Sequence, residues 1–208
     1  MADARSRAPQ ARTRLARRAV LDVARDLFLE RGYGATTIEG ISSASEIPQA
    51  TVYRLFSSKK GILKALLDTS VAGDDEPVPV AERSHVRSLL DATRPEDTLA
   101  RLAAVSVDIN TRTAPIYRIL VSAASSDTDA AAILDELTRQ RQEGQGRVAT
   151  ALARAKALRT GMRARDAGDI IHALASPELY HLLVHDRGWS PERYEQWLAG
   201  ALAGQLLP

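Results

Sequence analysis

The stretch Thr36–Lys59, TTIEGISSASEIPQATVYRLFSSK, predicts two short helices joined by a tight turn. Thr36 is followed three residues later by Glu39, which is the spacing of a capping box at a helix start. Two isoleucines then recur at helical spacing, and Pro48 interrupts the pattern. Proline disfavours helical geometry in the residue before it but suits the first positions of a new helix. The turn is therefore expected around Ile47, an apolar residue that can anchor it in a core.

The second helix of this stretch, Gln49–Phe56, separates into an apolar face and a polar face. Val52, Leu55 and Phe56 can pack inward. A recognition helix reads base edges with its N-terminal residues, and hydroxyl and guanidinium groups bind phosphates. The outward residues therefore predict a DNA-reading face made of Gln49, Ala50, Thr51, Tyr53 and Arg54. An ordinary helical hairpin with a polar outer face gives the same pattern, and from the residues alone both interpretations stay open.

The residues before this stretch predict one amphipathic helix over 13–31, which Gly32 is expected to end. Its apolar residues recur at three- and four-residue steps and predict a stripe in the core: Leu15, Ala19, Val20, Val23, Ala24, Leu27 and Phe28. Residues 1–12 are polar and arginine-rich, so a disordered basic arm is expected there. Such an arm can follow the DNA backbone or simply solubilise the terminus, and both roles stay open.

The run Leu27–Leu63 resembles the N-terminal domain of the tetracycline-repressor (TetR/AcrR) family of transcriptional regulators. The matching residues keep the family's spacing without a gap: Phe28, Gly32, Thr36, Thr37, Ile38, Ile41, Ile47, Thr51, Val52, Tyr53, Phe56, Ser58 and Lys59. The turn departs from the family pattern, because Ser45-Glu46 stands where Ala-Gly is usual and Pro48 where serine is frequent. Glu46 would need an uncommon backbone geometry for a residue with a side chain, unless the turn differs. Gly61 replaces a usual glutamate and is a poor helix residue.

The resemblance implies an all-α fold with a three-helix, helix-turn-helix DNA-binding head over residues 13–60. A connecting helix would join this head to a helical effector-binding and dimerisation domain over residues 61–208. In the family, the tyrosine of the recognition helix and a lysine after it usually touch phosphate, which assigns that role to Tyr53 and Lys59. Thr37 is expected to make a further backbone contact. The candidate DNA-binding residues are then Thr36, Thr37, Gln49, Ala50, Thr51, Tyr53, Arg54 and Lys59.

Composition agrees with a helical protein that binds phosphates. The chain has 208 residues and no cysteine, which excludes disulfides and thiolate metal sites. Residues 1–64 carry 12 Lys and Arg against 6 Asp and Glu, whereas the remainder carries 16 against 20. A basic head on a mildly acidic body suits nucleic-acid binding. The basic N-terminus is not followed by an apolar run of signal-peptide or membrane-spanning length, so a cytoplasmic protein is expected.

After the head, Ser57-Ser58 can cap a helix that starts near Lys59. An acidic, proline-containing loop is expected at residues 73–80. Further helices are expected over 83–92, 95–111, 114–125, 128–156, 164–186 and 191–206. Pro115 separates two of them in this interpretation, and Pro177 is expected to kink another.

The resemblance also implies partners for the C-terminal half. In the family, the last two helices commonly pair with their copies in a four-helix interface, which implies a homodimer through residues 164–186 and 191–206. Burial of their wide apolar faces within one subunit is the alternative. The family keeps a small-molecule effector among helices corresponding to residues 95–156, and its identity here is unknown. Polar residues interrupt apolar runs in that region at Arg101, Asp108, Asn110, Arg112 and Tyr117.

No catalytic or cofactor motif stands out, so neither enzyme activity nor a cofactor is expected. His181 and His185 have metal-ligand spacing, but the HExxH arrangement is missing and no metal is expected. The predicted function is a ligand-responsive repressor that binds a palindromic operator in double-stranded DNA as a dimer. The alternative is a helical ligand-binding or interaction module whose helix-turn-helix no longer reads DNA. A metal-responsive regulator that uses the two histidines is a third interpretation.

Overall fold

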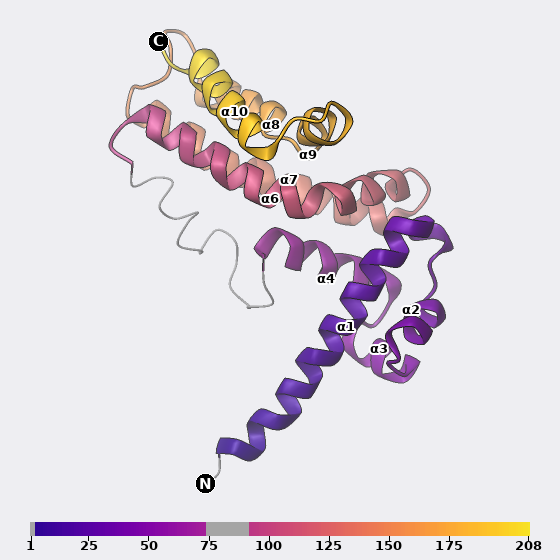
Figure 1. The fold of residues 1–208 in the computed structure, drawn as a ribbon. Helices are drawn as coiled ribbons and strands as arrows, with labels where there is room; N and C mark the ends of the chain where they lie inside the picture. The colour runs from indigo at the N-terminus through magenta and orange to yellow at the C-terminus, as the bar shows by residue number, and fades with distance from the viewer. Residues whose placement is uncertain (1–2, 74–91) are drawn as a thin grey trace. The chain divides into compact units, whose positions relative to one another are not determined.

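The computed structural model describes residues 3–73 and 92–208, with only the backbone described over 3–10. All regular structure in these ranges is helical (Figure 1), which confirms the predicted all-α class. The elements are α1 (Asp3–Ala35), α2 (Ile38–Ser45), α3 (Gln49–Phe56), α4 (Lys59–Ala72), α6 (Pro95–Ala124), α7 (Thr128–Arg154), α8 (Ala164–Leu174), α9 (Pro177–Tyr180), a π-helical turn (His181–Asp186) and α10 (Pro191–Leu206). The helix expected at 83–92 and most of the loop at 73–80 lie outside the described residues.

The chain forms two compact units that do not follow the predicted boundary at residue 60. The first, called the head below, contains Met1–Thr69 and Arg118–Ile133. The second, called the body, contains Ser70–Tyr117 and Leu134–Pro208. Most of α4, up to Thr69, belongs to the head, and Ile62, Leu63, Leu66 and Leu67 on it are buried. None of the helices in the described ranges combines the length and apolar character needed to cross a bilayer.

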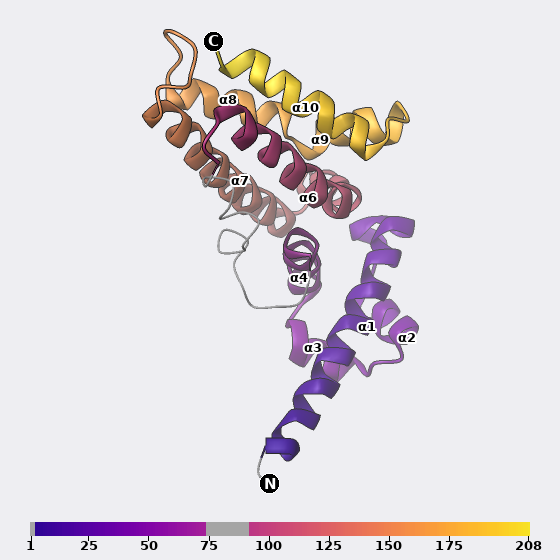
Figure 2. The ribbon, with the colours of Figure 1, turned by 60° about the vertical axis from the view of Figure 1, so that its left-hand side comes forward.

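Helix α1 begins at Asp3, so the expectation of a disordered arm is wrong for residues 3–12. Alanine and arginine recur in this segment, and both are strong helix formers that extend the amphipathic helix toward the N-terminus. The predicted core stripe also starts later than expected, because Leu15 is 68% exposed whereas Val20 is fully buried. The first part of α1 therefore leaves the packed head (Figure 2).

Gly32 ends the regular part of α1, as predicted. Its φ of 77° and ψ of 167° lie outside the helical region and are easily adopted only by glycine. The chain turns back, so that Tyr33 is buried against Phe28 with ring centroids 5.6 Å apart. Lys59 of α4 closes this corner: its Nζ donates to the carbonyl oxygens of Tyr33 (2.8 Å) and Gly34 (3.4 Å) and lies 4.3 Å from the Tyr33 ring centroid.

The cap of α2 is one residue later than the predicted capping box. Thr37, not Thr36, is the N-cap, and its Oγ1 accepts a hydrogen bond from the Gly40 amide at 3.0 Å. At the other end of α2, Glu46 has φ 57° and ψ 20°, which is the left-handed conformation. The turn therefore keeps the geometry for which glycine is the usual residue. Ser42 holds the turn closed, because its hydroxyl donates to the Ile47 carbonyl oxygen at 2.7 Å.

The α3–α4 junction explains the glycine at position 61. Ser57 has a positive φ of 64°, and the Ser58 Oγ accepts a hydrogen bond from the Gly61 amide at 3.1 Å, as a cap for α4. A Cβ on residue 61 would lie only 1.9 Å from the Phe56 carbonyl oxygen. Any side chain there would force this junction to open, so the departure from the family's usual glutamate has a local structural cause.

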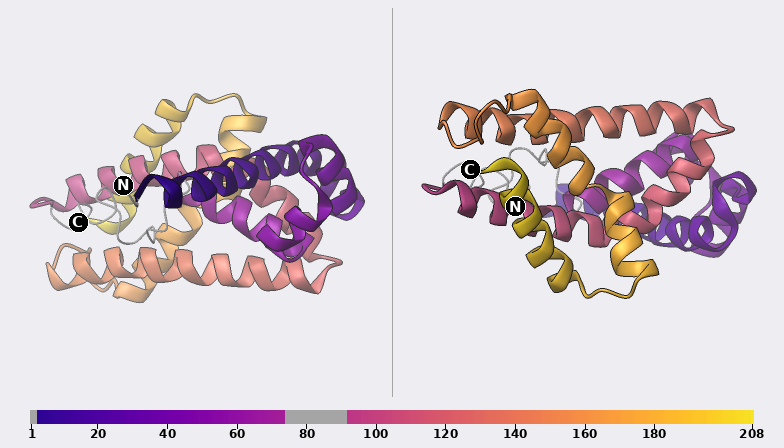
Figure 3. Two further views of the ribbon diagram at one scale, coloured as in Figure 1. Left: turned by 90° about the horizontal axis from the view of Figure 1, so that it is seen from below. Right: turned by 90° about the horizontal axis from the view of Figure 1, so that it is seen from above.

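In the body, α6 is continuous through Pro115, so the predicted break there is wrong. Burial of Ala114 and Ile116 on either side outweighs the lost helical hydrogen bond. The expected kink at Pro177 is instead a complete break: Ser176 caps α9 by accepting from the Leu179 amide at 3.1 Å. Helix α10 packs against α8 (Figures 1 and 3), and its buried side is continuous with the body's core.

Replacing Glu46 with glycine should stabilise the head by about 0.5–1 kcal/mol, because the left-handed conformation strains any residue with a Cβ. Both tryptophans lie in the body, so their fluorescence does not follow the head. The measurement is hydrogen–deuterium exchange of α1–α3 amides in the full-length protein. Glu46→Ala is the control, since it removes the carboxylate but keeps the Cβ. Equal slowing of exchange in both variants would contradict backbone strain as the cause.

Replacing Lys59 with methionine should destabilise the head by about 1–2 kcal/mol, because two carbonyl oxygens lose a charged donor and the Tyr33 ring loses a cation. Lys60→Met is the matched control. Lys60 forms an exposed ion pair with Asp129 at 2.9 Å, and such pairs contribute about 0–1 kcal/mol. The same exchange experiment reports both variants. If Lys59→Met and Lys60→Met speed amide exchange of the head equally, Lys59 does not hold the end of α1.

Candidate DNA-binding site

Helix α3 has the two faces that the sequence predicts. Val52 is fully buried, Phe56 is 6% exposed, and Leu55 is half-buried. On the opposite side Tyr53 is 50% exposed. Gln49, Ala50 and Arg54 are also exposed, and Thr51 is partly so. The residues predicted to read DNA therefore form one accessible polar surface, called the α3 face below.

The α3 face rests on a rigid support within the head. Helices α1 and α2 both contact α3. The Arg17 guanidinium of α1 lies over the Phe56 ring, 4.7 Å from its centroid. At the start of α3 the amides of Thr51 and Val52 donate to the Pro48 carbonyl oxygen at 2.8 and 3.1 Å. No side chain caps this N-terminus, where backbone N–H groups and the helix dipole favour an anion.

Thr36 does not belong to the accessible surface, so its assignment to the DNA-binding set is wrong. Its side chain is 2% exposed, and Oγ1 lies 2.8 Å from the Gly32 carbonyl oxygen and 3.2 Å from that of Leu27. The hydroxyl ties the end of α1 to the start of α2. Thr37 is exposed, and because its oxygen accepts the capping bond, its O–H remains a donor.

Lys59 has a structural partner that the resemblance does not predict. Two of the three ammonium donors are directed at the carbonyl oxygens of Tyr33 and Gly34. Burial lowers the pKa of Lys59, and the negative charge of Asp127 partly opposes this shift. Lys59 is thus half-buried and already paired, whereas Tyr53 is open to solvent. The phosphate contact of Lys59 stays a prediction, and only one of its three ammonium N–H donors is left for that contact.

A polar network in the body joins α6, α7 and α9. The Tyr117 hydroxyl donates to Glu178 Oε1 at 2.8 Å. Burial, the hydrogen bond to Glu178 and its charge raise the pKa of Tyr117 to about 12. Arg141 interacts electrostatically with Tyr117 and Glu178, and its guanidinium donates to the His172 carbonyl oxygen at 3.4 Å. Burial lowers the pKa of Arg141. Tyr117 stands out in the sequence as a polar residue in an apolar run, whereas Arg141 does not, because one arginine within an amphipathic helix carries no distinguishing signal.

The other polar residues noted in α6 are accounted for by the fold. Asn110 is 4% exposed, and its Nδ2 donates to the Ala175 carbonyl oxygen at 3.3 Å. Arg112 donates from Nε to the Ser70 carbonyl oxygen at 2.9 Å and pairs with Asp108. Arg101 is exposed. Tyr117, in contrast, is buried and belongs to the network that joins α6, α7 and α9.

His181 and His185 lie together on the π-helical turn but do not build a metal centre with a third ligand. Their rings stack with centroids 4.7 Å apart, and His181 Nε2 lies 3.2 Å from Asp186 Oδ1. Across the described ranges, no group of three or more His, Cys, Asp or Glu side chains is placed to hold a metal ion.

Comparison with known proteins places the head in a family. Residues 20–66 match the model of bacterial regulatory proteins of the tetR family. The uncharacterized helix-turn-helix transcriptional regulator YvkB of Bacillus subtilis is 40% identical over 48 residues. That match covers 23% of this chain and 25% of YvkB, so the chain matches about a quarter of that relative's length.

Solved structures resemble the chain over nearly its whole length. NalD, the secondary repressor of the MexAB-OprM multidrug efflux pump in Pseudomonas aeruginosa, is 21% identical, with a TM-score of 0.71 over 94% of this chain and 98% of NalD. A transcriptional regulator from Saccharomonospora viridis in complex with choline is 19% identical, with a TM-score of 0.69 over 93% of this chain and 98% of that one. At these identities the likeness is one of fold. The match to the tetR family of bacterial regulatory proteins therefore covers residues 20–66, and the solved structures show that the chain as a whole shares their fold.

Proposed function

We propose that this protein is a cytoplasmic transcriptional repressor that binds a palindromic operator as a homodimer and is released by a small molecule. The α3 face carries this proposal. It presents amide, hydroxyl and guanidinium groups on a helix whose opposite side is buried, and a matched family model covers the same residues. An exposed polar face on a fixed helix is what base reading in a major groove requires.

Within the α3 face, we assign base reading to Arg54 and backbone contacts to Tyr53 and Thr37. An arginine can donate two parallel hydrogen bonds to a guanine edge, whereas a single hydroxyl donor suits a phosphate oxygen. The uncapped N-terminus of α3, at Gln49 and Ala50, adds backbone donors for a phosphate. Direct base reading then depends mainly on one guanidinium.

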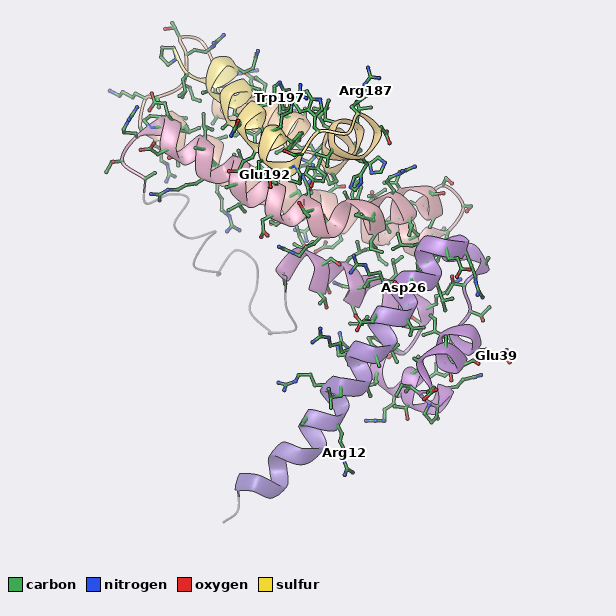
Figure 4. All side chains as sticks on the ribbon, in the orientation of Figure 1. Arg12, Asp26, Glu39, Arg187, Glu192 and Trp197 are labelled. Atoms are coloured by element: carbon green, nitrogen blue, oxygen red, sulfur yellow. The ribbon has the colours of Figure 1, made fainter. Side chains whose placement is uncertain are left out.

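The homodimer would form through α8 and α10. The buried side of α10 packs into the body's core, and its other side exposes Gly200 and Gly204 one helical turn apart. Nothing in the described part of the chain lies within 4 Å of a Cβ built at either glycine. Between these sides Trp197 (Figure 4) is partly buried and meets the Trp189 ring edge-on at 6.0 Å. Two-fold pairing here would give the symmetry that a palindrome requires.

Release by a small molecule is supported by the body's chemistry and by relatives. NalD is a repressor, and the Saccharomonospora viridis neighbour holds choline. In this chain the Tyr117, Arg141 and Glu178 network lies between helices, where polar groups can orient a ligand. A ligand would release DNA only by binding more tightly to the conformation that fits DNA poorly.

The direct test is selection of bound sequences from a pool of random duplex DNA with the wild-type protein and Arg54→Ala. The wild type should enrich a palindrome with half-sites about one helical turn, roughly 34 Å, apart. Arg54→Ala should lose preference at one base pair of each half-site, costing about 1–3 kcal/mol in discrimination there. A wild type that enriches nothing would favour the ligand-binding module that no longer reads DNA.

Gly200→Arg should weaken the dimer without harming the subunit. The new side chain meets open space within one chain, and arginine is the better helix former, but it would place a charge inside the proposed interface. Sedimentation analysis should show a shift toward monomer. Gly144→Arg is the matched control, because Gly144 is exposed in α7 and its Cβ would also meet nothing within 4 Å. An unchanged dimer in Gly200→Arg would exclude α10 from the interface.

A further inference from the structure

We propose that the N-terminal extension of α1, residues 3–16, is a second DNA-contacting element in which Arg12 and Arg14 bind the phosphate backbone beside the site that α3 reads. This inference rests on the proposed function and adds to it a surface outside the helix-turn-helix. Residues 1–21 contain six arginines and a single acidic residue, Asp3. A surface of this charge complements a phosphate backbone.

Residues 11–15 of the extension, where the side chains are described, are all exposed. Leu15 is 68% exposed, and Arg12 and Arg14 are exposed as well. Neither arginine makes a hydrogen bond or an ion pair with the part of the chain that the structure describes. Figure 4 shows Arg12 on the part of α1 that runs beyond α2 and α3. The two guanidinium groups thus have no partner among the described residues and are exposed to one outside the chain.

The root of the extension lies at the recognition helix. Arg17 is stacked over Phe56, the last residue of α3, with 4.7 Å between the guanidinium carbon and the ring centroid. From Arg17 the helix continues for 14 residues to Asp3, which is about 21 Å at 1.5 Å per residue. Any duplex bound at the α3 face would therefore lie near the start of this rod.

Helical geometry spreads the free arginines around the rod. Arg12 and Arg14 are two residues apart and so point about 160° apart around the helix axis. Duplex DNA carries one charge per about 1.7 Å of its axis, so a rod of this length passes on the order of ten phosphates. Arginines on both sides can contact phosphates of both strands. None of these contacts requires a base edge, so the extension adds affinity without sequence preference.

The test compares the salt dependence of binding for full-length wild type, the double variant Arg12→Gln/Arg14→Gln, and a matched double variant Arg147→Gln/Arg154→Gln. The control removes the same charge from exposed positions of α7. The probes are a mixed-sequence duplex and the duplex that wild type enriches from a random pool. Each single variant is measured as well, to show which side of the rod carries the contact.

The double variant in the extension should bind several-fold more weakly at near-physiological salt. Its slope of log affinity against log salt should fall by about 0.9 for each lost phosphate contact, or about 1.8 per subunit. The sequence motif that it selects should stay that of wild type. The α7 control should keep the wild-type slope.

Equal slopes for the extension variant and wild type on both probes would overturn the proposal and leave the extension as a solubilising tail. An equal fall in slope for both double variants would also overturn it, because the effect would then follow net charge alone. Failure of the proposed function is a separate result, since it appears as no enriched motif in wild type. Unchanged far-UV circular dichroism of the variants excludes loss of folding as the cause.

Discussion

The head depends on the burial of the inner side of α3 against α1 and α2. Val52 and Phe56 on α3 and Ile41 on α2 are almost entirely removed from water. Burying a large apolar side chain contributes about 1.5–3 kcal/mol, more than any of the surface ion pairs in this unit. Since α3 has only eight residues, it would be marginally stable as an isolated helix. Packing against α1 and α2 keeps it helical. The same packing fixes which residues face outward.

That constraint explains why the outer face was predictable and parts of its surroundings were not. Apolar periodicity decides which side of α3 is buried, and it decided correctly for Val52 and Phe56. Choosing between two adjacent threonines for a cap is harder, because either could start the helix. The structure gives the cap to Thr37 and buries Thr36. The error matters for function, since it removes one hydroxyl from the candidate site.

Other differences come from interactions between residues far apart in sequence. Lys59 lies 25 and 26 residues from the carbonyls that it binds, and no local pattern announces such a pairing. No sequence pattern indicates the role of Arg141 either, although its guanidinium belongs to the network at Tyr117. Pro115 shows the opposite case: a strong local signal for a helix break is overridden by burial of its neighbours. Local sequence signals therefore predict most helix boundaries of this chain, whereas the partners of the polar side chains depend on tertiary contacts.

The polar residues of the head divide into those that the fold uses and those that it leaves free. Hydroxyls of Thr36, Ser42 and Ser58 and the ammonium of Lys59 all bind backbone groups at corners between helices. Such bonds are needed, because helix ends leave N–H and carbonyl groups unpaired. The exposed side chains with no partner among the described residues include Tyr53 and Arg54 on the α3 face and Arg12 and Arg14 near the start of α1. Since phosphates and base edges require free donors, the proposed DNA contacts have two parts: a short helix with sequence preference and a basic rod without it.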